Sequence, residues 1–470
     1  MHAMRTGKHG RRNHRSSRCS TGVVWCFWLL AALGLSTGRA HADWPDTLAT
    51  RPDPFQRLAS LDAGQIASLW SSLPDTTGCQ PGSFALSGHA QFLAESDALR
   101  DDTQPGPFSF LQPRTRVQAD GTGRWGCVFG QLALQRQTGP DGRDQWTWDG
   151  SALAWQIDPY WRVAGGRIAR QWGPAWDGSL ILGTAARPVA SVAVDARTGP
   201  LSRDGYWWWL GELDFTAFFG ELDDNRGDYD RPYLMGARLV LRPWTWLELG
   251  ASRTAQWGGE GRDNSLRAFW TAVAGRDNQD GDPSQQPGNQ LGGFDLRLNL
   301  SKWLGGVGLY GQMIGEDEAA SLPAKYMYLA GADWRQPWGM AFVEWTDSTA
   351  KLAGVAYNHH IYTDGYRYGG GVLGHWADGD SSLWTVGGLL RELLGGQALA
   401  VFRYGRLNES GINPSWPNAR LGQASLQWRT QFERAFGLTV ALDHLRLNSQ
   451  GSDASRSDTT LRVQLDAWLH

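Results

Sequence analysis

Alternation of apolar and polar residues constrains the fold of this chain more than any other feature. In segments 294–300, 426–432 and 461–467, every second position carries an apolar residue or threonine, and Asp, Arg, Asn or Gln stands between. Successive side chains of a β-strand point to opposite faces, so this period of two predicts strands with one apolar and one polar face. Similar segments recur from about residue 116 onward, separated by Gly, Asp and Asn turns.

Such strands form either a soluble sandwich or a transmembrane barrel, and the aromatic residues favour the barrel. The chain has 27 Trp and 60 Gly, and aromatic residues cluster near segment ends, as at 206–209 and 244–246. Membrane barrels use Trp and Tyr as girdles at the two membrane interfaces. The many Arg, Asp, Gln and Asn residues on the polar face suit a wet lumen. We therefore predict an all-β, transmembrane antiparallel β-barrel.

The N-terminus predicts export. Six basic residues precede an apolar stretch at 23–35, and Ala40-His41-Ala42 fits an A-x-A cleavage site. The apolar stretch is too short to span a bilayer as a helix. Residues 1–42 are therefore interpreted as a signal peptide, with a short anchor helix as the alternative, and we expect the mature protein in the outer membrane.

Residues 43–115 are rich in Pro, Ser and Asp, and short helical patterns occur at 54–73 and 91–100. We interpret 43–115 as a small periplasmic helical region and 116–470 as the barrel. Cys79 and Cys127 are the two cysteines beyond the signal segment. In an exported protein they form either a disulfide or two buried free thiols.

A net charge of −3 with no basic stripe gives no indication of nucleic-acid binding. The histidines His359, His360 and His375 do not match the spacing of a metal site. Asn278, Asp280 and Asp282 alternate as in part of a calcium loop, but the Gly and Glu of an EF-hand are missing. We expect neither a metal nor a cofactor.

Several longer motifs are more specific than barrel strands require. They include GRIARQWGPAWDGSL at 166–180, FGELDD at 219–224, SRTAQWGG at 252–259, GEDEA at 315–319, YNHHIY at 357–362 and DGYRY at 364–368. In order and content this series resembles the Wzi-type capsule assembly proteins of Gram-negative outer membranes. The resemblance is strong over residues 160–380, and elsewhere it rests on the texture of the strands.

This resemblance implies a closed barrel of about 18 strands with a small helical bundle on the periplasmic side. It also implies a lectin that helps attach capsular or exopolysaccharide to the cell surface. The length agrees, because residues 116–470 provide roughly 20 residues for each strand and turn, and a membrane strand takes about 9–11. The partners we expect are this polysaccharide and outer-membrane lipid, with the protein acting as a monomer.

Acidic runs at 221–224 and 316–318 raise the alternative of a polysaccharide-acting enzyme, since glycoside hydrolysis uses two carboxylates about 5–10 Å apart. Adjacent strand residues point to opposite faces, so the runs are better interpreted as partners of lumen arginines such as Arg253, Arg267, Arg297 and Arg367. A porin for sugars or other solutes is the other alternative. No catalytic residues are predicted.

Aromatic rings can stack on sugars while charged and amide groups bond to hydroxyls. The same aromatic residues, including Tyr366, also suit interface girdles or lumen packing. The residues that we predict for polysaccharide binding or a lumen network are Arg170, Trp172, Trp176, Asp177, Arg253, Gln256, Trp257, Glu316, Asp317, Glu318, Tyr357, Asn358, His359, Tyr362, Asp364 and Arg367.

Overall fold

The computed structural model describes residues 84–95, 115–138, 144–198, 208–223, 226–274, 288–319, 322–350, 356–413, 416–432, 435–449 and 455–469. The predicted signal peptide, Cys79 and most of the predicted helical region lie outside these ranges. The predicted calcium-like loop at 275–289 also lies outside them, up to residue 287.

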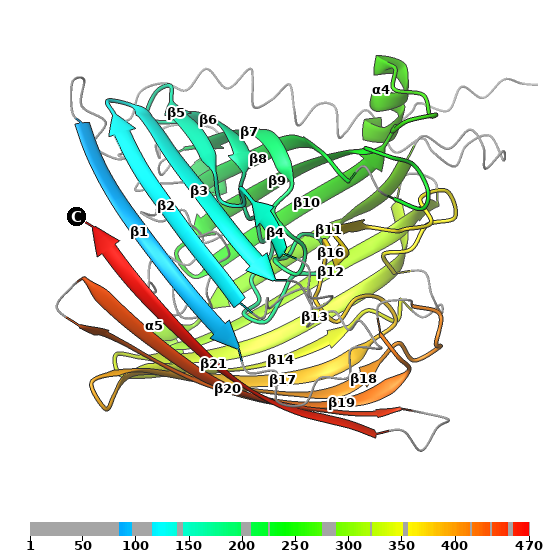
Figure 1. Cartoon of the computed structure of the whole chain (residues 1–470). Helices are drawn as coiled ribbons and strands as arrows, with labels where there is room; N and C mark the ends of the chain where they lie inside the picture. Colours follow the sequence, from blue (N-terminus) through cyan, green and yellow to red (C-terminus); the bar gives the residue numbers. More distant parts are fainter. Residues whose placement is uncertain are drawn as a thin grey trace, which may run out of the picture. The chain divides into compact units, whose positions relative to one another are not determined.

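The described strands close into one antiparallel barrel (Figure 1). The sheet has nineteen strands, and the first, β1, pairs with both β2 and the last, β21. Strands β4 and β5 pair with successive parts of β3, so they share one place in the barrel wall. The wall therefore has eighteen positions, which confirms the predicted architecture.

The wall strands follow each other in chain order. Their bounds are β1 Phe84–Glu95, β2 Thr115–Trp125, β3 Val128–Thr138, β4 Asp144–Thr147, β5 Ala152–Gln156, β6 Trp161–Arg167, β7 Ala190–Arg197, β8 Glu212–Glu221, β9 Tyr233–Trp244, β10 Leu247–Trp257, β11 Gly288–Asn299, β12 Val307–Ala319, β13 Leu322–Gln336, β14 Gly339–Asp347, β17 Ser382–Leu393, β18 Gly396–Leu407, β19 Ala419–Phe432, β20 Phe436–Ser449 and β21 Ser455–Leu469.

Short elements lie in the connections between wall strands. They are the 3-10 helix η2 Trp208–Leu210, the helices α4 Leu266–Ala274 and α5 Ser301–Leu304, and the small hairpin β15 Arg367–Tyr368 and β16 Gly371–Val372. Of the helices in the described ranges, none has the length and apolarity to cross a bilayer.

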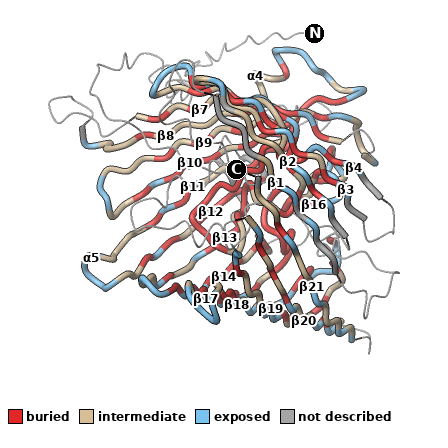
Figure 2. The backbone as a smooth tube through the Cα atoms, turned by 60° about the vertical axis from the view of Figure 1, so that its left-hand side comes forward, coloured by how far each residue is buried: buried red, intermediate tan, exposed pale blue. Residues whose placement is uncertain are grey.

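The predicted alternation determines which side chains face the lumen. In β14, Phe342, Glu344 and Thr346 are buried, whereas Ala341 and Val343 are exposed. Buried and exposed residues alternate in the same way along many strands in Figure 2. Because the inward set mixes polar and apolar residues and the outward set is largely apolar, the exposed face is the one that suits lipid.

One end of the barrel has short turns, as between β9 and β10 and between β13 and β14. Tryptophans gather there: the rings of Trp244 and Trp246 stack at 5.3 Å, and those of Trp334 and Trp338 meet edge to face at 5.5 Å. Outer-membrane barrels have short periplasmic turns, longer extracellular loops and aromatic girdles. We call this the short-turn end and the opposite one the long-loop end.

Strand β1 corrects the expected domain boundary. Residues 91–95 belong to this strand and pair with both β2 and β21, so their interpretation as part of a helix is wrong. The wall starts before residue 116. Small residues such as Ser87, Gly88 and Ala90 weaken the alternation of β1, and the adjacent Phe92 and Leu93 imitate helical spacing. For the rest of 43–115, the helical region stays a prediction.

The outward face can be tested at Leu426, whose side chain is 55% exposed in the apolar part of β19. We expect Leu426→Arg to lower the free energy of unfolding from lipid vesicles by about 2–4 kcal/mol, since it puts a charge into hydrocarbon. The control is Gln427→Arg, because Gln427 lies opposite the buried Ala441 on the lumen face. Equal losses in the two variants would contradict the assigned faces.

Candidate functional site

Two connections from the long-loop end bond to inward-facing wall residues. The first lumen segment is residues 168–189, between β6 and β7, and the second is residues 356–381, between β14 and β17. Most of their residues are buried, and their apolar side chains share one core with Leu291, Ile314, Met327 and Phe342 of the wall. The lumen is therefore occupied by the protein's own chain.

Asp177 attaches the first lumen segment to the wall. Its carboxylate accepts hydrogen bonds from Arg403 of β18, at 2.5 and 2.9 Å to Oδ1, and from Thr385 of β17, at 2.7 Å. The indole of Trp376 donates to the same carboxylate at 3.0 Å. Because Trp376 belongs to the second lumen segment, one buried ion pair joins both segments to the wall.

Glu344 of β14 holds the adjacent backbone. Its carboxylate accepts the amide N–H groups of Trp176, at 2.5 Å, and of Asp177, at 3.0 Å. Tyr310 of β12 donates its hydroxyl to the same carboxylate at 2.8 Å. A buried carboxylate needs such donors, because leaving it unpaired in a low dielectric costs several kcal/mol.

Polar and charged side chains of the wall surround the Trp176 ring. Its Nε1 donates to Asp333 of β13 at 3.0 Å, and Asp333 also accepts a hydrogen bond from Arg297 of β11. The Arg297 guanidinium lies 5.7 Å from the centre of the Trp176 ring and 5.1 Å from that of Tyr310. These contacts fix the ring in place and leave it 7% exposed.

Gln312 of β12 fixes another part of the same segment. Its amide nitrogen donates to the carbonyl of Trp172 at 2.8 Å, and its amide oxygen accepts the N–H of Leu180 at 2.8 Å. The Trp172 ring meets Phe218 of β8 edge to face at 5.5 Å and is 2% exposed. The first lumen segment is thus bonded to strands on several sides of the lumen.

Tyr357 connects the two lumen segments. Its N–H donates to Glu316 of β12 at 2.7 Å, and its hydroxyl donates to the carbonyl of Leu180 at 2.7 Å. The same hydroxyl accepts the N–H of His375 at 3.2 Å. Tyr357 is fully buried, so it acts as a structural link in this conformation.

Arg367 organises the second lumen segment internally. Its Nη2 donates to both carboxylate oxygens of Asp378 at 2.8 Å, and its Nη1 donates to Asn358 at 3.1 Å. A guanidinium that bridges several acceptors in this way restricts a long connection to one conformation.

The described part of a neighbouring connection, residues 222–223 and 226–232, packs on this arrangement. Arg226 bonds to Asp228 through two nitrogens and donates to the carbonyls of Gly365 and Arg367. Asp364 completes the contact, since its N–H donates to Asp228 at 2.9 Å. The outermost parts of the second lumen segment are therefore also held in place.

Aromatic and cationic groups meet at this outer level. Tyr229 and Tyr362 lie edge to face at 5.9 Å, and the Arg262 guanidinium is 5.2 Å from one ring centre and 5.4 Å from the other. Tyr362 is fully buried, and its hydroxyl donates to the carbonyl of Gly258 at 2.9 Å. Tyr229 and Arg262 are half-buried, whereas His360, two residues before Tyr362, is exposed.

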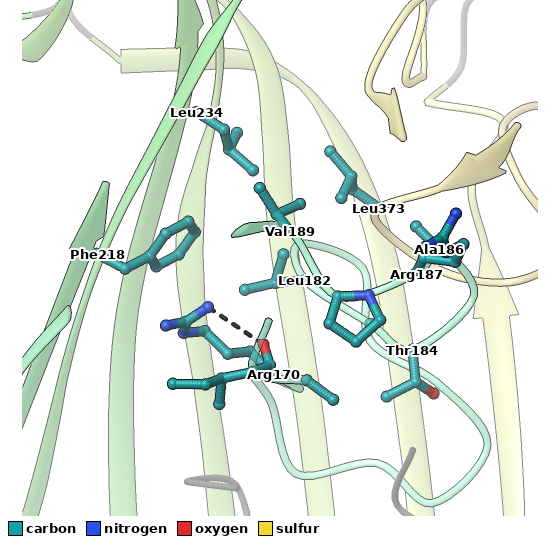
Figure 3. A pocket seen from close by; sticks show the side chains of 13 residues that line it. Arg170, Leu182, Thr184, Ala186, Arg187, Val189, Phe218, Leu234 and Leu373 are labelled. Carbon is teal, nitrogen blue, oxygen red and sulfur yellow. Dashed lines mark hydrogen bonds between the residues drawn. The ribbon is translucent and has the colours of Figure 1, made fainter. Parts of the chain in front are cut away.

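Arg170 lies beside a small cavity of about 20 Å³ between the first lumen segment and the wall (Figure 3). Its guanidinium lies 4.5 Å from the Phe218 ring centre and donates to Ser191 at 2.9 Å and to the carbonyl of Ile168 at 3.2 Å. A cavity of this size has room for about one water molecule. A sugar residue does not fit there.

The predicted residues of β10 lie elsewhere. Arg253 bonds to Gln290, and Gln256 is fully buried. Trp257 is covered by Phe269 of α4, with ring centres 5.4 Å apart. They belong to the wall and to the packing of α4.

The structure thus places most of the predicted set in a lumen network or in the wall. Trp172, Trp176, Trp257, Tyr357 and Tyr362 are all covered, whereas Asn358, His359 and Asp364 are partly exposed. Asp317 and Glu318 lie in β12, but their side chains are outside the described part. Direct contact of any of these residues with polysaccharide stays a prediction.

Three functional residues, Asp333, Glu344 and Arg403, were not predicted from the sequence. Each is a charged residue at an inward position of its strand, and in β13 Asp333 shares that face with Arg335. Their inward position is the sequence signal that could have identified them, because a charge inside a membrane strand faces the lumen and needs a partner there.

Cys127 is disulfide-bonded. Cys79 lies outside the described residues, so the predicted Cys79–Cys127 pairing stays a prediction. Among the described residues, no three His, Cys, Asp or Glu side chains are grouped in a way that would hold a metal ion.

Asp177 and His375 are two of the groups in the lumen segments whose pKa values are displaced. Burial raises the pKa of Asp177, but the charge and hydrogen bonds of Arg403 outweigh this effect and bring it to about 2. Burial lowers the pKa of His375 to about 4, and the Asp177 carboxylate opposes only part of that effect. At neutral pH the carboxylate is charged and the imidazole is neutral.

Removal of the Asp177 carboxylate leaves Arg403 buried without its counter-ion. We expect Asp177→Ala to lower the free energy of unfolding by about 3–5 kcal/mol. Amide exchange should accelerate at residues 176 and 177. The free energy of unfolding and the amide exchange can both be measured in detergent. The control is Asp443→Ala, which removes the wall pair with Arg462 and should leave those two amides protected. Unchanged exchange in Asp177→Ala would contradict the anchoring role.

We expect His375 to make the packing of the lumen segments sensitive to pH. Its ring lies so close to Gly178 that a Cβ there would be 2.4 Å from Cδ2. The folded pKa of about 4 is below the unfolded value of about 6.5, so folding disfavours the protonated ring. The stability is fully present above pH 6.5 and is lost progressively down to about pH 4.

We therefore expect the melting temperature to fall between pH 7 and pH 4.5, and to fall less in His375→Gln, which cannot gain this charge. Asp177 stays ionised over that range, because its pKa is about 2. An identical fall in both proteins would show that His375 does not titrate in this way.

Comparison with known proteins identifies the family. The model of the capsule assembly protein Wzi family matches residues 113–459. An uncharacterized 55.8 kDa protein in the cps region of Klebsiella pneumoniae is 38% identical over 183 residues, which are 38% of this chain and 35% of that protein. The match thus spans about a third of the relative's length.

The fold has a solved counterpart. The structure of Escherichia coli Wzi, described as an outer membrane protein involved in group 1 capsule assembly and a carbohydrate-binding β-barrel, is 26% identical with a TM-score of 0.68. The similarity covers 81% of this chain and 83% of that one. The chain belongs to the Wzi family of capsule assembly proteins.

Proposed function

We propose that this protein holds capsular or exopolysaccharide at the outer surface of the outer membrane, as a monomeric, non-enzymatic lectin. The observation that carries the proposal is the filled lumen, in which two segments are bonded to the wall and to each other. We propose polysaccharide as the ligand because the members of this family are capsule assembly proteins.

The contact surface that we propose is the outer layer of the second lumen segment and its neighbours. Tyr229 and Arg262 are half-buried there, and His360 of the second lumen segment is exposed. Their arrangement offers an aromatic edge and a guanidinium to a sugar chain, and Asp364 provides a carboxylate close by. Stacking and charge-assisted hydrogen bonds are the usual means of sugar recognition.

The two alternatives have less support. A porin needs a continuous aqueous path, whereas the lumen segments occupy the barrel interior. An enzyme acting on glycosides needs two carboxylates with room for a sugar between them. Asp177 and Glu344 lie close together, but each is saturated by hydrogen bonds from the protein.

Deletion of the gene tests the proposal when cell-bound and released polysaccharide are measured separately. We expect the bound fraction to fall while the total output stays unchanged. Restoring the gene with Arg262→Ala should leave retention below that of the wild type, whereas Arg267→Ala, which changes an exposed arginine of α4, should restore it fully.

Equal retention in the two variants would contradict the contact surface, and an unchanged bound fraction after deletion would contradict the function itself. The purified protein should also leave the chain length of the same polysaccharide unchanged. Shortening of the chains would support the enzyme instead.

A further inference from the structure

Three arginines point outward on neighbouring strands near the long-loop end. Arg406 of β18, Arg420 of β19 and Arg446 of β20 are exposed, and each alternates with inward residues along its strand. Arg406 pairs directly with Arg420, and Arg446 stands diagonally to Arg420, since it pairs with Gly422. We call these three residues the outer arginine cluster.

Aromatic residues show where this cluster lies along the membrane normal. Trp384 and Tyr404 face each other across β17 and β18, one outward position nearer the short-turn end than Arg406. They are 55% and 54% exposed. Exposed Trp and Tyr mark the headgroup level of a barrel. The outer arginine cluster is therefore at the level of outer-leaflet headgroups.

An apolar strip continues from the cluster toward the short-turn end. Phe402, Leu426, Leu442 and Leu461 are each about half exposed on consecutive strands. The register places Leu426 opposite Leu442 and Leu442 opposite Leu461. A molecule that binds the arginines thus has an apolar surface beneath it on the same strands.

The charges of the cluster are not balanced by the wall. The outward positions of β18 to β21 in the described chain carry no carboxylate. Arg406 reaches Glu409 of the following connection at 3.6 Å, and Arg446 donates to Asn448 at 3.3 Å. Like charges placed opposite each other on neighbouring strands are destabilising, so an anion between these arginines would stabilise the surface.

The space between the arginines is open. Gly422 lies between Tyr404 and Arg446, and a Cβ added to it would meet no atom within 4 Å. Guanidinium groups match the geometry of phosphate oxygens with two parallel hydrogen bonds. The open space over Gly422 therefore leaves room for a phosphate next to Arg420 and Arg446, its neighbours on the outward face.

We propose that the outer arginine cluster binds the phosphorylated headgroup of an outer-leaflet glycolipid, whose acyl chains lie along the apolar strip. The continuity of the basic and apolar surfaces favours a lipid over an acidic polysaccharide, because a polysaccharide has no acyl chains that would cover Phe402, Leu426 and Leu442. This site is on the outside of the barrel and does not depend on the proposed polysaccharide contact.

Native mass spectrometry of the detergent-solubilised protein tests the site with two probes, lipid A with both phosphates and lipid A with both phosphates removed. We expect the wild type to prefer the phosphorylated form by about tenfold or more. The double variant R420Q/R446Q should lose that preference. The matched control is R136Q, because Arg136 is also an exposed residue near the long-loop end, where it lies over Trp146, and it is not part of the cluster.

Equal binding of the two lipids by the wild type would overturn the proposal, as would an equal loss in R420Q/R446Q and R136Q. A third arm adds an acidic polysaccharide, polygalacturonate, to the lipid-free protein. Cluster-dependent binding of this polymer without any preference for phosphorylated lipid would assign the arginines to polysaccharide instead. The melting temperature of each variant confirms that the barrel is folded, and the comparison of two lipids on the wild type needs no variant.

Discussion

The buried pair between Asp177 and Arg403 is the interaction on which the interior of this barrel depends. It joins the first lumen segment to the wall, and Trp376 brings the second segment to the same carboxylate. Glu344 fixes the backbone next to it. Because ionic groups in a water-poor interior are costly without partners, Asp177 on the segment and Arg403 on the wall each need the other, whereas wall charges such as Asp443 and Arg462 pair with each other.

Much of the wall was predictable from sequence, because a period of two is itself the structure of a strand with two different faces. The eighteen positions came from the family resemblance and agree with the register. Strand β1 was not predicted, because its small residues at 87, 88 and 90 give little contrast between the two faces of the strand. The interior was predictable in part: the motif around Asp177 was recognised, but its partners were not. Glu344 and Arg403 lie 167 and 226 residues away along the chain, and no local pattern joins them.

The difference between inward and outward strand positions explains how one barrel has two different charged surfaces. Inward charges pair either with the lumen segments, as in Asp177 and Arg403, or with each other, as in Asp443 and Arg462, so they contribute to shape. Outward charges near the long-loop end, such as Arg406 and Arg420, face each other without a carboxylate on the described wall between them. Inward and outward charges therefore have different surroundings, although both occupy alternate positions of the same strands.

Current through single molecules in planar bilayers tests whether the two lumen segments close the barrel. We expect no steady conductance for the wild type across a range of voltages, because Asp177, Glu344 and Tyr357 keep the segments in the lumen. A stable, voltage-independent open pore in the intact protein would contradict it.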